Sequence, residues 1–313
     1  MPVLARDRDR GKRRRGLRDA EHPQGAIAAG FLAPALVALV AFFLLPIAAA
    51  FALSFTDFDL YALADLRNLR FAGLENYARW LRDPGFWRAF ANTLYFVGLG
   101  APLSVGVSLG AALLLCARSA RAQAFFRTVY FVPVVTTLVA VAVVWRFLYH
   151  PRLGLANRAL AWLGLGPIDW LGDPAIAMPA LILLAVWKNF GFNMVIFVAG
   201  LQSIPERLYE AARLDGATRW QELREVTLPM LLPTTAFVAL MTLIGHFQLF
   251  AEPYVMTQGG PEDSTRSLVL LLYEQGFRWW NLGQAAVVSV LLFAMVLALT
   301  LLARAWRGRK AFA

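Results

Sequence analysis

Residues 202–233 read QSIPERLYEAARLDGATRWQELREVTLPMLLP and form the most charged stretch inside the chain, between two long apolar runs. Their capping and turn residues predict two short helices joined by a tight turn. Ser203 and Glu206 stand three positions apart, which is the spacing of a capping box at the start of the first helix. Gly216 is placed to end that helix, because glycine takes the left-handed backbone conformation without a steric cost. The stretch is therefore predicted to be compact and rigid.

The second predicted helix of this stretch begins with another capping box, formed by Thr218 and Gln221. The pair Leu228–Pro229 is predicted to break it just before the next apolar run. On the first helix, an apolar stripe follows the i, i+4, i+7, i+8 spacing of one helix face: Ile204, Leu208, Ala211 and Ala212. An amphipathic helix with small residues on its apolar face suits a groove on a soluble partner.

The composition places the chain among integral membrane proteins. Of its 313 residues, 59% are hydrophobic and only 16% are charged, whereas a soluble domain carries about 25% charged residues. The formal net charge of +10 gathers at the two ends and in certain loops, which in a membrane protein is first an orientation signal. With Cys116 as the only cysteine, the chain has neither a disulfide framework nor a cysteine-based metal site.

Six apolar runs are long enough to cross a bilayer, so the predicted fold is an all-α polytopic membrane protein. Their approximate limits are 27–53, 89–116, 125–149, 175–201, 229–251 and 284–303. The charged stretch opened above then forms a loop between the fourth and fifth runs. No internal repeat or low-complexity linker divides the chain, so residues 26–313 are predicted to be one membrane domain.

Residues 1–25 form a basic arm that is too charged to pack and is predicted to be disordered. A twin-arginine signal or a cleaved signal peptide is an alternative, but the run 27–53 exceeds a signal core and is interpreted as a retained span. Six spans place both termini on one side. That side also contains the charged loop. It is predicted to be cytoplasmic, because three basic segments lie on it: the arm, the link at 118–127 and the tail.

Polar side chains within the spans are candidates for a solute path, because each is costly in a membrane. They are Asn189 and Asn193 with neighbouring Trp187 in the fourth span, and His246 and Gln248 in the fifth. Amides could bind a hydroxylated solute while aromatic rings stack on it. The competing interpretation is interhelical hydrogen bonding that only holds the bundle together. Lys188 is expected to snorkel or to meet a carboxylate on a partner helix.

The sequence shows no catalytic or energy-coupling machinery of its own. The only lysines are Lys12, Lys188 and Lys310, and none lies in a phosphate-binding loop. The three histidines are scattered, so no metal site is predicted. No paired acids occur within a span, which argues against a proton relay. The turn in the charged stretch resembles a DNA-reading helix-turn-helix, but the flanking spans and the modest charge exclude a nucleic-acid partner.

The charged stretch resembles the EAA loop of binding-protein-dependent ABC transporter permeases. That pattern is E-A-A-x-x-x-G, nine residues, then I-x-L-P. Here Glu210, Ala211, Ala212, Gly216, Leu228 and Pro229 match, with Val226 in place of isoleucine. Asp215, in the variable part before the glycine, is included in the predicted contact with the ATPase. GLENYARWLRDPGFWRAFANTLYF, FFRTVYFVPVV and VMTQGGPEDST also resemble carbohydrate-type permeases of the maltose and glycerol-3-phosphate group. The likeness covers nearly the whole chain beyond the arm.

This resemblance implies a subunit of a multi-pass importer in the bacterial inner membrane. A second, different permease subunit would complete the path through the lipid bilayer, and an extracytoplasmic solute-binding protein would deliver a sugar or related solute. An ABC ATPase dimer would receive the EAA loop, with Glu210 and Gly216 at the contact. ATP and Mg²⁺ would bind that ATPase, so no cofactor is expected in this chain and the chain is not itself an enzyme.

Two other classes are weighed against this interpretation. A secondary carrier or channel acting alone would need ionisable coupling residues in its spans and would have no use for the capped two-helix loop. A membrane-embedded enzyme would need a nucleophile with a base, an acid pair or a metal cluster, and the sequence shows none of them.

Overall fold

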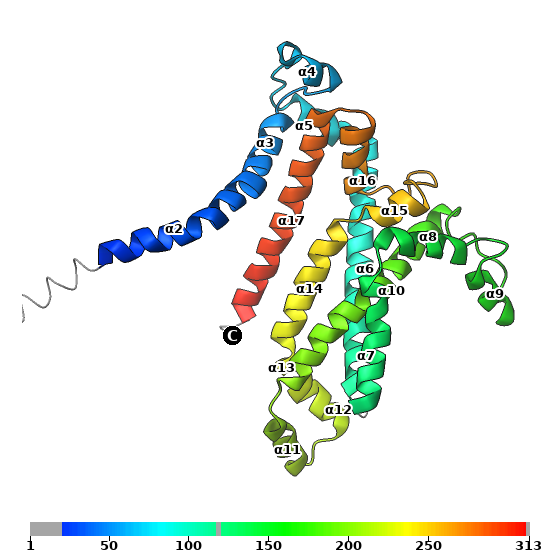
Figure 1. Ribbon diagram of the computed structural model, residues 1–313. Helices are drawn as coiled ribbons and strands as arrows, with labels where there is room; N and C mark the ends of the chain where they lie inside the picture. Colours follow the sequence, from blue (N-terminus) through cyan, green and yellow to red (C-terminus); the bar gives the residue numbers. More distant parts are fainter. Residues whose placement is uncertain (1–20, 117–119, 311–313) are drawn as a thin grey trace, which may run out of the picture. The chain divides into compact units, whose positions relative to one another are not determined.

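The computed structural model describes residues 21–116 and 120–310, which belong to two compact units, one ending at Leu53 and one beginning at Ser54 (Figure 1). The first unit holds α2 (Glu21–Leu39), the π-helical turn η1 (Val40–Leu44) and all but the last residue of α3 (Leu45–Ser54). The predicted basic arm lies outside the described residues as far as residue 20, and residues 21–25 belong to α2.

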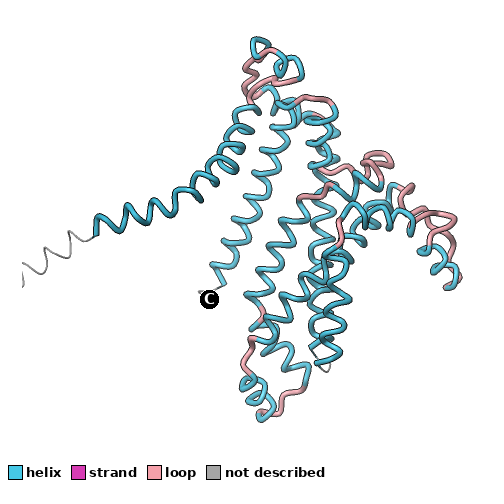
Figure 2. Tube along the Cα trace, viewed as in Figure 1, coloured by secondary structure: helices cyan, strands magenta, loops and turns pink. Residues whose placement is uncertain are grey.

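The second unit is helical, with helices joined by short loops (Figure 2). Its described residues form no β-strand, only one isolated bridge between Thr56 and Phe71. The elements are α4 (Leu60–Ala64), η2 (Leu66–Asn68), α5 (Glu75–Arg82), α6 (Pro84–Cys116), α7 (Ala120–Val135), α8 (Leu138–Leu148), α9 (Leu155–Trp162), α10 (Pro174–Gln202), α11 (Glu206–Leu214), α12 (Arg219–Gln221), η3 (Glu222–Thr227), α13 (Leu228–Met230), α14 (Leu232–Phe247), α15 (Ala251–Met256), α16 (Leu268–Tyr273), η4 (Glu274–Arg278) and α17 (Leu282–Lys310).

The predicted all-α polytopic fold is confirmed. In the described part of the chain, four helical segments are long and apolar enough to cross a membrane: Gly30–Ser54, Pro84–Cys116, Pro174–Gln202 and Leu282–Leu301. Two further helix pairs meet the test together but are bent, so the number of spans is six only if each bent pair is one span. These pairs replace the straight third and fifth spans that the sequence predicts.

The third predicted span breaks between α7 and α8, which meet at 98°. Pro133 lies near the end of α7, and Thr137 has the extended backbone of an N-cap residue, so the helix restarts in a new direction. The hydroxyl of Thr136 donates a hydrogen bond of 2.7 Å to the Pro133 carbonyl, which satisfies one acceptor at this end of α7.

A bend of 63° separates the helical run Arg219–Met230 from α14, near the start of the fifth predicted span. The break comes at Leu231, later than the predicted Leu228–Pro229, because η3 continues directly into α13 and the helical run passes through Pro229. Pro229 sits in the first turn of α13, and Pro233 occupies the same place in α14. The helix then ends at Phe247, before the predicted limit of the span.

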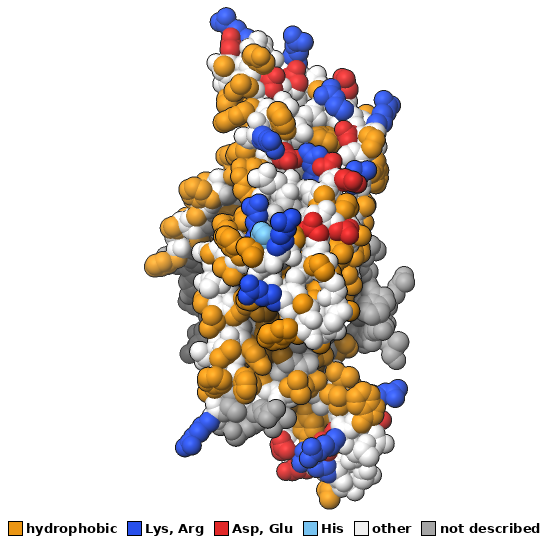
Figure 3. Space-filling view, turned by 90° about the vertical axis from the view of Figure 1, so that its right-hand side faces the viewer, with side chains coloured by type: hydrophobic (Ala, Val, Ile, Leu, Met, Phe, Trp, Pro, Cys, Tyr) orange, Lys and Arg blue, Asp and Glu red, His pale blue; other side chains and the backbone are white. Residues whose placement is uncertain are grey.

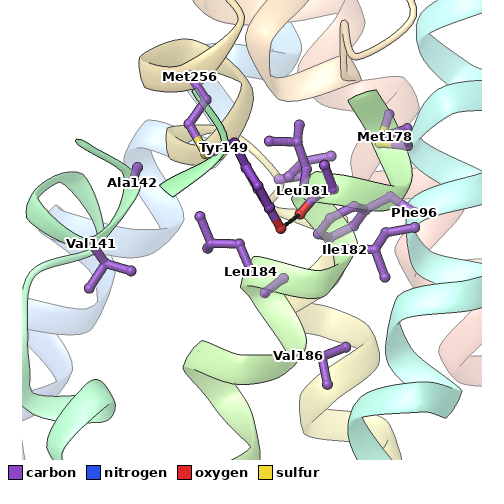
Figure 4. Packing of buried hydrophobic residues seen from close by; sticks show 13 residues of the cluster. Phe96, Val141, Ala142, Tyr149, Met178, Leu181, Ile182, Leu184, Val186 and Met256 are labelled. Carbon is purple, nitrogen blue, oxygen red and sulfur yellow. Dashed lines mark hydrogen bonds between the residues drawn. The ribbon is translucent and has the colours of Figure 1, made fainter. Parts of the chain in front are cut away.

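Helix α10 is the centre of the second unit and packs against α6, α7 and α14. Buried side chains from α10 form one core with others from α6, α8 and α15, and Figure 4 shows them gathered around the N-terminal half of α10. The Tyr149 hydroxyl donates a hydrogen bond of 3.0 Å to the Ala180 carbonyl within this core. The closest backbone approach is at Gly191, where a Cβ atom would lie 1.9 Å from the Tyr130 carbonyl oxygen.

Candidate functional site

The charged loop between α10 and α14 folds as a pair of short helical segments, as predicted (Figure 1). Helix α11 ends at Leu214, and Gly216 follows with φ of +82°, in the left-handed region that glycine favours. The Ala217 amide donates a hydrogen bond of 2.9 Å to the Ala212 carbonyl, which closes the end of α11. The predicted role of Gly216 as the end of the first helix is confirmed.

Of the two predicted capping boxes, only the second is present. The Thr218 amide donates to Gln221 Oε1 at 2.7 Å, and the Gln221 amide donates to Thr218 Oγ1 at 3.4 Å, so α12 starts as predicted. The box of Ser203 and Glu206 is wrong. Ser203 ends α10, where its hydroxyl donates a hydrogen bond of 2.7 Å to the Gly200 carbonyl, and Pro205 precedes α11 without a side-chain cap.

Two cross-links hold the helical segments of the loop together. Arg213 Nε donates to Glu222 Oε1 at 3.0 Å, and the guanidinium also lies 3.7 Å from Glu206 Oε1. The hydrogen bond with Glu222 raises the pKa of the Arg213 guanidinium above its ordinary value. The Tyr209 and Thr227 hydroxyls lie 3.0 Å apart and form the second link, and Thr227 is buried. The loop can therefore move as one body.

Much of the surface of the loop is not covered by the rest of the described chain. No residue of α11 is buried, and Leu214 and Trp220 are 89% and 68% exposed. The residues predicted for partner contact are exposed apart from half-buried Ala212: Glu210, Ala211, Ala212, Asp215, Gly216, Leu228 and Pro229. On the face seen in Figure 3, charged side chains gather over this loop, below a band of hydrophobic ones. Leu214 and Trp220 were missed from sequence, although large apolar residues in a charged stretch are a signal.

Four of the five predicted solute-path residues line one cavity of about 460 Å³. Asn189 and Asn193 come from α10, His246 from α14, and Gln248 from the residue that follows it. Trp187 does not line the cavity, because it lies against Trp145 with ring centroids 5.4 Å apart and is 39% exposed. Its place in a solute path stays a prediction, separate from this cavity. The cavity also contains aromatic and acidic side chains that sequence reasoning missed: Phe96, Phe192, Phe250 and Glu252.

The polar cavity residues are partly engaged in bonds within the bundle. Asn193 Nδ2 donates to Thr242 Oγ1 at 2.9 Å, which joins α10 to α14, and Asn189 Nδ2 donates to the Ala185 carbonyl at 2.9 Å. The bond from Asn193 fits the interhelical interpretation. Binding of a solute stays a prediction, for which each amide has further hydrogen-bond capacity after one N–H is used. At the start of α15, burial raises the pKa of the Glu252 carboxyl, and the charge of Lys188 opposes that rise.

His246 lines the cavity, while its Nε2 is buried beside Gly100 of α6. Its Nδ1 lies 2.8 Å from the Thr242 carbonyl, and a carbonyl can only accept, so Nδ1 carries the proton. In the neutral ring Nε2 is then an acceptor, and it finds no hydrogen-bond partner among the described residues. The ring packs beside Phe96 with centroids 5.2 Å apart and over Gly100, where an added Cβ would lie 3.0 Å from the imidazole.

Lys188 neither snorkels nor meets a carboxylate directly, so that prediction is wrong. Its Nζ donates to the Pro133 carbonyl at 2.6 Å and to the Val134 carbonyl at 3.1 Å. Carbonyls in the last turn of a helix have no intrahelical partner, and a basic side chain stabilises them. Lys188 thus holds the end of α7 at its break against α10. Among residues 21–116 and 120–310, no group of three or more His, Cys, Asp or Glu could hold a metal ion.

Comparison with known proteins agrees with this architecture. Residues 103–309 match the family described as binding-protein-dependent transport system inner membrane component. The lactose transport system permease protein LacF of Rhizobium radiobacter is 35% identical over 87% of this chain and 91% of its own length. The arabinooligosaccharides transport system permease protein AraP of Bacillus subtilis is 32% identical over 92% and 90%. A bacterial alginate ABC transporter, solved with a periplasmic protein bound to an alginate pentasaccharide, shares the fold, with a TM-score of 0.78, 22% identity and coverage of 91% and 94%.

Proposed function

The chain belongs to the family of binding-protein-dependent transport system inner membrane components, as a carbohydrate-type ABC transporter permease, and on that premise we propose its place in the transporter. It is one of two permease subunits that together enclose the path of a sugar or related polar solute. The other is a different permease of the same family. An extracytoplasmic binding protein supplies the solute, and two ATPase subunits bind the loop that contains α11 and α12.

One observation carries this proposal: the cross-linked loop joins α10 directly to α14, the two helices whose amides and imidazole line the cavity. Asn193 lies about 15 Å along α10 from the start of the loop, at ~1.5 Å per residue. A movement of the loop therefore displaces two cavity walls at once. ATP-driven closure of the ATPase subunits supplies the differential contacts that such a switch requires.

We further infer the sides of the membrane from the distribution of charge: the loop and both termini face the cytoplasm. Helices α15 and α16, which lie away from the α11 loop within the second unit (Figure 1), face the binding protein. The solute reaches the cavity between Asn189, Asn193, His246 and Gln248, where amide and imidazole groups replace its water and Phe96 and Phe250 pack against its ring. ATP and Mg²⁺ bind on the ATPase subunits, and this chain binds lipid and protein partners but no nucleic acid.

Charge reversal at Glu210 tests the proposal. Glu210 is exposed and forms no ion pair within the described chain, so Glu210→Lys leaves folding and membrane insertion intact. We expect co-purification of the ATPase subunit and ATP-dependent uptake in proteoliposomes to be lost. Glu75→Lys is the control, a charge reversal at another exposed position, on α5 outside the loop, where the only ion pair among the described residues is an exposed contact of 3.9 Å with Arg79. Normal ATPase binding and uptake in Glu210→Lys would refute the coupling role.

A further inference from the structure

An aromatic track leads away from the cavity toward the end of the unit opposite the α11 loop. We give this name to Phe250, Tyr254, Tyr273 and Phe277. Phe250 and Tyr254 are stacked at 5.2 Å, Tyr254 and Tyr273 are 5.1 Å apart, and Tyr273 and Phe277 are stacked at 5.5 Å. Phe250 is itself a wall residue of the cavity. The four rings therefore form a continuous surface that begins at the candidate solute cavity.

The far part of the track borders a separate pocket of about 310 Å³. Tyr254, Tyr273 and Phe277 line it together with the polar side chains of Gln258, Glu274 and Arg278. A pocket near 300 Å³ with aromatic walls and a few fixed polar groups is the usual form of a small-molecule site. Core packing does not account for these rings, because Tyr254 is 42% exposed and Phe277 is 63% exposed.

The charges at this pocket are neutralised within the chain. Glu274 is buried and accepts hydrogen bonds from Arg266 Nε, at 2.9 Å, and from the same guanidinium's Nη2. Arg278 lies 3.8 Å from the other Glu274 oxygen, and its guanidinium lies over the Trp279 ring. Arg266 also lies 3.6 Å from Asp263, so the two arginines are matched by two carboxylates, and neither an anion nor a cation would find an unpaired opposite charge here. The remaining donors and acceptors, including the hydroxyls of Tyr254 and Tyr273, suit hydroxyl groups.

We propose that the aromatic track is a second, outer solute site, which holds a neutral sugar ring by stacking before that ring enters the cavity. A pyranose has an apolar face that can lie on an aromatic ring and a rim of hydroxyls that can reach polar groups at the pocket edge. Because Phe250 belongs to both surfaces, a solute can pass from one to the other without full exposure to water. The inference rests on the proposed function only in that the track leads to the solute path.

Saturation-transfer NMR on the complete transporter in nanodiscs, without the binding protein, tests this site. The probes are methyl β-D-glucopyranoside, which has a ring, and mannitol, which has similar hydroxyls but no ring. In the wild type, we expect the glucoside to receive clearly more saturation than mannitol. Tyr254→Leu and Phe277→Leu should each lower the glucoside signal about three- to tenfold. Trp162→Leu, which removes an exposed aromatic ring on α9, should leave it unchanged.

The outcomes separate this inference from the proposed function. A glucoside signal that both track variants retain overturns the outer site. A signal lost in Asn193→Ala but kept in the track variants places all binding in the cavity, which overturns the outer site and leaves the proposed function standing. The second permease subunit could also be lost when the Tyr254→Leu or Phe277→Leu transporter is purified. That result would show that the track is a contact between subunits, which also overturns the outer site. Failure of ATP-dependent uptake by the wild type would count against the proposed function alone.

Discussion

Replacement of Gly191 by alanine should separate α7 from α10 and destabilise the transporter. The new Cβ would lie 1.9 Å from the Tyr130 carbonyl oxygen and 2.8 Å from its carbon. The closest comfortable approach of a carbon to a carbonyl oxygen is about 3.3 Å, so the two helices must part by roughly 1.4 Å. Both clashing groups are fixed by backbone geometry, and no side-chain rotation can relieve the overlap.

This displacement also breaks the bonds that hold the end of α7. Lys188 lies one turn before Gly191 on α10, and its ammonium binds the Pro133 and Val134 carbonyls at 2.6 Å and 3.1 Å. A shift of about an ångström takes the longer of these beyond the ~3.2 Å limit of a protein hydrogen bond. Overpacking of a tight contact costs about 1–3 kcal/mol, and we expect a loss of that size in the free energy of unfolding.

The assay is thermal unfolding of the purified transporter, followed by intrinsic fluorescence, with uptake measured in parallel. Gly98→Ala on α6 is the matched control, because a Cβ there would meet no atom within 4 Å. We expect Gly98→Ala to unfold at or slightly above the wild-type temperature, since alanine favours the helix. A Gly191→Ala transporter that unfolds at the control's temperature would show that the close approach of α7 and α10 is not a constraint, and the reasoning would fail.

Three further changes test neighbouring contacts. Thr218→Ala removes the cap of α12, so the loop's amide hydrogen exchange should speed up by an amount that corresponds to about 1 kcal/mol; unchanged exchange would rule out the capping role. Lys188→Met leaves the last carbonyls of α7 without a donor and should lower thermal stability by about 1–3 kcal/mol, whereas Lys188→Arg should recover part of the loss. A double-mutant cycle of Asn193→Ala and Thr242→Val, measured by detergent unfolding, should give a coupling of ~0.6 kcal/mol, and additive effects would exclude the bond between them.

The loop was the part of the chain most readily predicted from sequence, because its signals are local. A glycine at the end of α11 and the box of Thr218 and Gln221 depend only on neighbouring residues, and both are present. The failure at Ser203 has an equally local cause: one serine can serve the end of α10 or the start of α11, and it serves α10. Spacing alone does not decide between two helix ends that compete for one hydroxyl.

The helix breaks and the cavity were harder to predict from sequence, because they depend on contacts between segments that are far apart in the chain. Hydropathy predicted a straight third span, yet Lys188 stabilises the end of α7 from 55 residues away. Among the polar residues of the spans, Asn193 and His246 were found because polarity in a membrane is itself a signal. Trp187 and Phe250 could not be told apart by sequence, because both are aromatic and near polar neighbours. The packing distinguishes them: Trp187 lies against Trp145, whereas Phe250 lines the cavity.

Under the proposed function, helix α10 would connect a movement of the loop to a change in the solute path. From one turn to the next, it carries the lysine that holds α7, the glycine that lets α7 approach, and the asparagine that binds α14. At its end, the cross-linked loop follows without a flexible spacer, since only residues 203–205 separate α10 from α11. A displacement of α10 must therefore strain the α7 contact or carry α7 with it. Because the absence of a side chain at Gly191 already brings the α10 backbone against Tyr130 of α7, a movement of α10 toward α7 would carry α7 along, and the cavity wall would move with both helices.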